Sequence, residues 1–269
     1  MKNLILASIA IASTAVALAE PAQKIDVTAL PQQATMIDDV VVPVPSEVFN
    51  VLDRQGSPKW AQVLRATKEQ AKPIGEQPQI ALQLGTIIAE GFIAVEAENA
   101  EEVKKIGASV RKLAKALGVE KPVDKRANAI ISDANAKDWA GVRKELDGAM
   151  RDVKDAMHEL DSLALSQLIS IGGWLRGTEA LTEVVGKDFS QSGAELLHQP
   201  ILLDYFDKRL SGMPAKMKKQ QLVTDVQKGL LAIRPLIGIE DGTQISEKSL
   251  QEVGEITGRL IKSINSKAN

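Results

Sequence analysis

The spacing of apolar residues constrains this chain more than any other feature, because they recur every three or four positions along most of its length. The clearest run lies in the proline-free stretch 123–199 and comprises Trp139, Val142, Leu146, Met150, Val153, Met157 and Leu160. An α-helix places residues at these spacings on one face. The run therefore predicts a long amphipathic helix, and Asn135 is a candidate residue to cap its N-terminus.

The same spacing predicts helices in most of the remaining chain. A narrow apolar face from Val103 to Leu117 predicts a helix over 100–117 that Gly118 closes, with Pro122 confirming the stop. Further helices are expected over 46–56, from 57 to a break at Pro73 and Pro78, and over 79–98, 163–185, 190–210 (interrupted near Pro200), 214–234 and 246–264. Ser162 is either a turn between two helices or part of one continuous helix.

Signals for β-strands are nearly absent after residue 45, where no alternating run and no Asn-Gly hairpin occurs. We therefore predict an all-α multi-helix bundle of about eight or nine helices. Residues 20–45 hold four prolines and are interpreted as an extended, partly disordered arm with a strand signal at Val40–Val42. Residues 46–269 would form a single domain, and an alternative divides it into two similar halves, 46–122 and 123–269.

The N-terminus has the pattern of a secretory signal peptide. Lys2 precedes the apolar run Leu4–Val16, and Ala17–Ala19 provides small residues at a cleavage position. A membrane-spanning anchor requires about 20 strongly apolar residues. The apolar run here is shorter and is rich in Ala and Ser. We expect residues 1–19 to be removed, a bacterial periplasmic or secreted location, and no transmembrane segment in the mature chain.

Composition excludes several classes of function. The chain has no cysteine, which excludes disulfides, thiol catalysis, cysteine-bound zinc and covalently attached c-type haem. Its 33 basic and 35 acidic residues leave no concentrated basic face, so a nucleic-acid partner is not expected. One Tyr, three Trp and four Phe offer few aromatic faces for a sugar-binding cleft.

Two predicted helices contain interior glycines, each of which costs a helix about 1 kcal/mol relative to alanine. The small residues singled out are Gly85, Ala89 and Gly91 in the first helix, and Gly173 and Gly177 in the second. We interpret them as a site of close helix packing, and a slot for a ligand is the alternative. The two Gly-rich helices also prompt the hypothesis of duplicated halves.

Both histidines follow an acid by three residues, as Asp155–His158 and Glu195–His198. This spacing places acid and imidazole on one helical face, and paired motifs of this kind bind di-iron or di-manganese centres in bundles. Glu90 or Glu96 and Glu179 or Glu183 could supply the additional acids. Polar neighbours of His158 and the proline after His198 favour ordinary surface or capping histidines, so we predict no cofactor and no catalytic residue.

Our leading hypothesis is an exported, non-enzymatic helical protein that acts as a binding or scaffolding module in the bacterial envelope. Its partner would be an unidentified envelope protein or a small ligand, and Val40–Val42 could bind a partner by strand addition. The first alternative is a metal-binding bundle that uses both histidines. The second is a carrier of an apolar ligand, with a cavity lined by Gly85, Gly91, Gly173 and Gly177 as its structural sign.

Overall fold

The fold is described from a computed structural model, which covers residues 59–65, 71–237 and 244–267 together with the backbone of two strands at 35–37 and 40–42. The expected signal peptide (1–19), most of the arm (20–45) and the helix expected over 46–56 lie outside the described residues. Residues Gln32–Asn269 form one compact unit. Its possible division into similar halves stays a prediction.

Helices make up nearly all of the described secondary structure, which confirms the all-α multi-helix bundle. The helices are α2 (Gln77–Glu96), α3 (Ala100–Ala116), α4 (Glu120–Ala136), α5 (Trp139–Glu159), α6 (Leu163–Lys187), α7 (Gln191–Ala194), α8 (Pro200–Ser211), α9 (Ala215–Lys218), α10 (Gln221–Ile233) and α11 (Glu247–Ile264). Short 3₁₀ turns are η2 (Trp60–Gln62), η3 (Glu195–Leu197) and η4 (Arg234–Ile237).

Two three-residue strands, β1 (Thr35–Ile37) and β2 (Val40–Val42), pair in antiparallel fashion. In their register Thr35 faces Val42 and Ile37 faces Val40. One edge of β2 is therefore already hydrogen-bonded within the chain, to β1. The extended arm around these strands stays a prediction.

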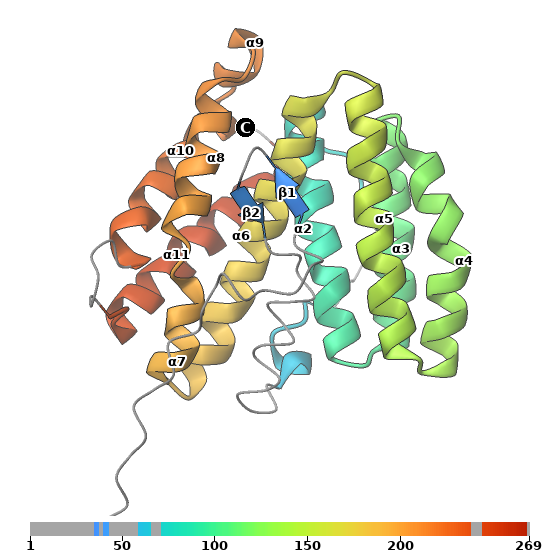
Figure 1. The fold of residues 1–269 in the computed structure, drawn as a ribbon, viewed down its shortest axis with the longest axis horizontal. Helices are drawn as coiled ribbons and strands as arrows, with labels where there is room; N and C mark the ends of the chain where they lie inside the picture. The colour runs from blue at the N-terminus through green and yellow to red at the C-terminus, as the bar shows by residue number, and fades with distance from the viewer. Residues whose placement is uncertain (1–34, 38–39, 43–58, 66–70, 238–243, 268–269) are drawn as a thin grey trace, which may run out of the picture. The chain divides into compact units, whose positions relative to one another are not determined.

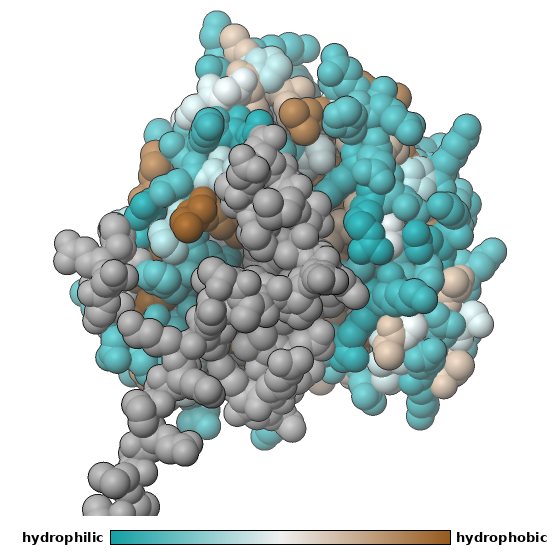
Figure 2. Space-filling model, in the orientation of Figure 1, coloured by the Kyte–Doolittle hydropathy of each residue, from teal (hydrophilic) through white to brown (hydrophobic). Residues whose placement is uncertain are grey.

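Helices α2 and α6 lie side by side at the centre of the described unit (Figure 1). Helices α3, α4 and α5 lie on one side of this pair, and α8, α10 and α11 on the other. Sixteen of the twenty residues of α2 are buried, as expected for a helix surrounded by others. Outward-facing side chains on the described surface in Figure 2 are mostly hydrophilic.

Helix α2 is the one described helix that is long and apolar enough to cross a membrane by length and composition. However, 94% of its most apolar window is buried inside the structure. Its apolar surface is therefore satisfied by packing against its neighbouring helices.

The α2 and α6 backbones meet at two glycines. A methyl group on Gly85 would lie far inside van der Waals distance of the Ile169 carbonyl oxygen, and one on Gly172 would do the same with the Leu82 carbonyl oxygen. Only glycine allows this approach. A methyl on Gly173 would lie 3.5 Å from the Gly85 carbonyl oxygen, which is ordinary contact.

Several predicted boundaries are wrong, and each error has a local cause. Helix α4 was not expected, because it buries only Val123 and Ala134 and so has little apolar periodicity. Asn135 lies inside α4; the residue that caps α5 is Asp138, whose carboxylate accepts a hydrogen bond from the Gly141 backbone N–H at 3.0 Å. Pro122 lies in the first turn of α4, where the missing N–H costs nothing.

Two further differences concern turns. The helix expected after Ser57 is, in its described part, only the 3₁₀ turn η2, and 71–76 is not helical. The helix expected over 214–234 is divided into α9 and α10. Ser162 is a turn, since Asp161 before it has a left-handed backbone (φ 50°) that ends α5.

The glycine contact gives a matched pair of substitutions on α6. We expect Gly172→Ala to lower the free energy of unfolding by about 3 kcal/mol, because the helices must separate. Gly177→Ala should raise it by about 0.5–1 kcal/mol, because no atom lies within 4 Å of the added methyl and alanine favours the helix. Urea unfolding measures both values, and equal effects of the two substitutions would contradict the close contact.

Candidate functional site

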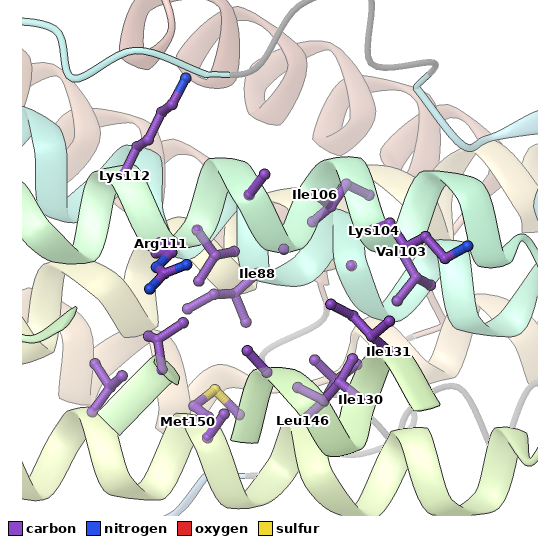
Figure 3. Close-up of a pocket in the computed structure, with 18 residues that line it drawn as sticks. Ile88, Val103, Lys104, Ile106, Arg111, Lys112, Ile130, Ile131, Leu146 and Met150 are labelled. Atoms are coloured by element: carbon purple, nitrogen blue, oxygen red, sulfur yellow. The ribbon is translucent and has the colours of Figure 1, made fainter. Parts of the chain in front are cut away.

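A cavity of about 350 Å³ lies between α2, α3, α4 and α5. Its walls are aliphatic, and Figure 3 shows side chains from the four helices converging on it. They include Ile88 from α2, Val103 and Ile106 from α3, Ile130 and Ile131 from α4, and Leu146 and Met150 from α5. Such a space can exclude water and hold an apolar molecule.

The cavity exists because each surrounding helix presents a small residue to it. These residues are Gly91 of α2, Gly107 and Ala108 of α3, Ala127 of α4 and Ala149 of α5. No atom lies within 4 Å of a methyl group built on Gly107. Gly107 is exposed and Ile131 is 40% exposed, so the cavity opens between α3 and α4.

Three charged residues line the cavity, and all are cations of α3: Lys104, Arg111 and Lys112. Arg111 forms ion pairs across the opening with two acids of α4, at 2.8 Å to Asp124 Oδ1 and 3.5 Å to Glu120 Oε1. Lys104 pairs with Glu101 one turn away on its own helix, at 3.0 Å. No residue that lines this cavity carries a carboxyl, hydroxyl or imidazole group.

The small residues predicted as a packing site or ligand slot are divided between two places. Gly91 lines the cavity. Gly85 lies at the α2–α6 contact with Gly173 beside it, and Ala89 is buried. Gly177 has open space around it. Of the four glycines expected to line a ligand cavity, only Gly91 lines the cavity described here.

The two Asp/Glu-x-x-His motifs lie in different surroundings. His158 and Asp155 are exposed near the C-terminal end of α5. His198 Nδ1 lies 2.9 Å from the Ile237 carbonyl oxygen, and Glu195 accepts hydrogen bonds from Gln191 Nε2 at 2.6 Å and the Ile245 N–H at 3.3 Å. Among the described residues, no group of three or more His, Cys, Asp or Glu side chains could hold a metal ion.

The four acids considered as additional metal ligands have other roles. Glu90 and Glu179 bind Arg176, as detailed below. Glu96 accepts two hydrogen bonds from Arg143, at 2.6 Å and 2.5 Å, which connects α2 to α5. Glu183 is exposed. The described residues therefore give the metal-binding alternative no support.

A buried ionic cluster connects α2, α6 and the segment 59–65. Arg176 is 1% exposed and donates hydrogen bonds to Glu90 Oε2 at 2.6 Å, Glu179 Oε2 at 3.2 Å and the Val63 carbonyl oxygen at 2.6 Å. Arg65 donates its backbone N–H to Glu90 Oε1 at 2.5 Å and its guanidinium to Glu179. Two buried carboxylates thus face the buried guanidinium of Arg176 and that of Arg65, whose side chain is 47% exposed.

Burial raises the pKa of the Glu179 carboxyl above its usual value, while Arg176 and Arg65 act in the opposite direction. The cluster was not predicted from the sequence. Glu90 and Arg176 are charged residues in strongly apolar helices. Because an isolated buried charge is too costly to remain unpaired, their positions in the sequence could have indicated a buried ion pair. We assign the cluster a structural role, since none of its members lines the cavity.

Comparison of the chain with models of protein families, with curated proteins and with solved structures finds no match.

Arg176→Met should lower the free energy of unfolding by about 3–5 kcal/mol, because it leaves two buried carboxylates without their shared cation. Removal of Arg176 takes away a cation that opposes the effect of burial, so the pKa of Glu179 should rise further in the folded variant. The loss should therefore shrink as the pH is lowered from neutral, because protonation of Glu179 then favours folding of the variant more than of the parent. Urea unfolding at several pH values tests both expectations. Arg259→Met is the control: this side chain is 68% exposed, so no comparable loss is expected.

Proposed function

We propose that this protein is an exported, non-catalytic binding protein that holds a small apolar molecule in the cavity between α2, α3, α4 and α5. The observation that carries the proposal is the cavity itself, with its volume of about 350 Å³ and its aliphatic walls. Small-molecule sites in proteins span roughly 300 to 1,000 Å³ and have mostly apolar walls.

An empty apolar space of this size is costly to a folded protein. Interiors are packed as densely as organic crystals and contain few voids larger than a water molecule. This space opens between α3 and α4, so an apolar molecule can enter it and displace water from its apolar walls. A resident ligand would recover the contacts that the walls of this cavity lack.

The lining favours binding over catalysis. Nucleophiles and general acid–base pairs are mostly hydroxyl, thiol, imidazole, carboxyl or lysine amine groups. Of these the described lining has only the amines of Lys104 and Lys112, and it has no carboxyl or imidazole group to act as their base. This favours the second alternative drawn from the sequence, the carrier of an apolar ligand, although of the four glycines expected to line its cavity only Gly91 lines this one. Strand addition through Val40–Val42 is less favoured, since β1 already occupies one edge of this strand.

Export is part of the proposal, on the pattern of residues 1–19. When the full chain is expressed in a bacterium, we expect the mature protein to begin at Glu20 and to collect in the periplasm or the medium. N-terminal sequencing of the fractionated protein checks this. A mature chain that keeps Leu4–Val16 would argue for an anchored or cytoplasmic protein.

Filling the cavity should abolish binding without loss of the fold. The full chain should enhance the fluorescence of the uncharged probe N-phenyl-1-naphthylamine, and Ala127→Leu should remove this signal because the new side chain occupies the ligand space. Urea unfolding should show Ala127→Leu to be at least as stable as the parent chain, because a void is filled.

Ala129→Leu is the matched control for this experiment. Ala129 is also in α4 but is exposed and does not line the cavity, so the probe should bind this variant normally. Equal probe binding by both variants would show that the cavity is not the binding site.

A further inference from the structure

We infer that the ligand of this cavity is an amphipathic anion with one hydrocarbon chain, whose acid group binds at Lys104. The inference rests on the proposed function and specifies its ligand class.

The face of α3 at the opening has small residues between two cations. Lys104, Gly107, Ala108 and Arg111 follow the spacing i, i+3, i+4 and i+7, so they lie in one row on the helix. The row is about 10 Å long from Lys104 to Arg111. Figure 3 shows these two residues at opposite ends of the cavity with isoleucine side chains between them. The space is therefore elongated, apolar along its length and charged only at its ends.

The Arg111 end is closed to a ligand anion. Asp124 and Glu120 of α4 both pair with the Arg111 guanidinium across the gap between α3 and α4. The Arg111 guanidinium is thus already paired with two carboxylates, and a ligand carboxylate would have to displace them. The pairs also hold α3 and α4 together there. The hydrocarbon end of a ligand is suited to this position.

The Lys104 end is open to an anion. Lys104 pairs with Glu101, whose side chain is 75% exposed, and exposed pairs of this kind contribute little. The Lys104 side chain is only 34% exposed, because its aliphatic stem lies along the cavity while its ammonium group reaches the rim. A ligand acid group at the rim would gain this cation and displace only a weak partner.

The lining also restricts the rest of the ligand. No acid lines the cavity, so nothing there would favour a cationic ligand. No hydrogen-bonding side chain other than the three cations of α3 lines it either, so a sugar or a compact polar anion would lose its hydration without compensation. The remaining class is a flexible hydrocarbon chain that ends in a carboxylate or a similar monoanion.

Three probes with the same ten-carbon chain test this inference by isothermal titration calorimetry on the full-length mature protein at neutral pH and low salt. We expect decanoate to bind about fivefold more tightly than decanol, because an exposed ion pair adds a modest increment. Decyltrimethylammonium should bind more weakly than decanol. The preference for decanoate should fall as salt is added.

Lys104→Gln should remove the preference for decanoate and leave the affinity for decanol unchanged. Glu101→Gln should increase the preference, because it frees the Lys104 ammonium group. Lys115→Gln is the matched control: Lys115 also belongs to α3 and is exposed, but it does not line the cavity, so the preference should persist.

The possible failures are distinguishable. If decanoate and decanol bind the parent chain with equal affinity, or if Lys104→Gln keeps the preference, the assignment of an anionic ligand is wrong while the apolar binding protein stands. If none of the three probes binds, and N-phenyl-1-naphthylamine does not bind either, the proposed function itself is wrong.

Discussion

The rest of the described structure depends on the contact between the backbones of α2 and α6. Gly85 and Gly172 allow it, because any side chain at either position would strike a carbonyl oxygen of the opposite helix. Dispersion forces act only at short range, so two long helices at this distance gain many contacts. The contact also sets their register, and it is this register that aligns Glu90 of α2 with Arg176 and Glu179 of α6.

The buried ions then restrict what the contact alone would permit. Apolar helix faces can slide along each other at small cost, whereas Arg176 of α6 loses Glu90 of α2 if either helix moves by a turn. The same cluster binds the segment 59–65 through the Val63 carbonyl and the Arg65 N–H. Glu90 and Gly91 are adjacent in α2, so successive residues of one helix face the ionic cluster and the cavity. Helix α2 thus forms one fixed wall of the cavity, and α3, α4 and α5 form the other walls.

Part of the site could be predicted from the sequence, because some of its features depend on residues of a single helix and others on several helices. Interior glycines at Gly85 and Gly91 indicated a close approach, because glycine in a helix has a cost that packing must justify. Which one meets a backbone and which one lines a cavity depends on residues of other helices. The histidine motifs show the same limit: spacing within one helix aligned Asp155 with His158, but no spacing could say whether a second motif lies opposite.

The sequence by itself determined the all-α class, most helix boundaries and the absence of thiol chemistry. These properties follow from residue types and from spacing within a few turns of chain, where geometry is fixed by the helix itself. Only the tertiary structure decided that Glu90 pairs with Arg176, that Gly172 touches Leu82, and that Gly107, Ala127 and Ala149 surround one empty space. A contact or a void belongs to several helices at once, and its existence depends on angles and distances that no single helix encodes.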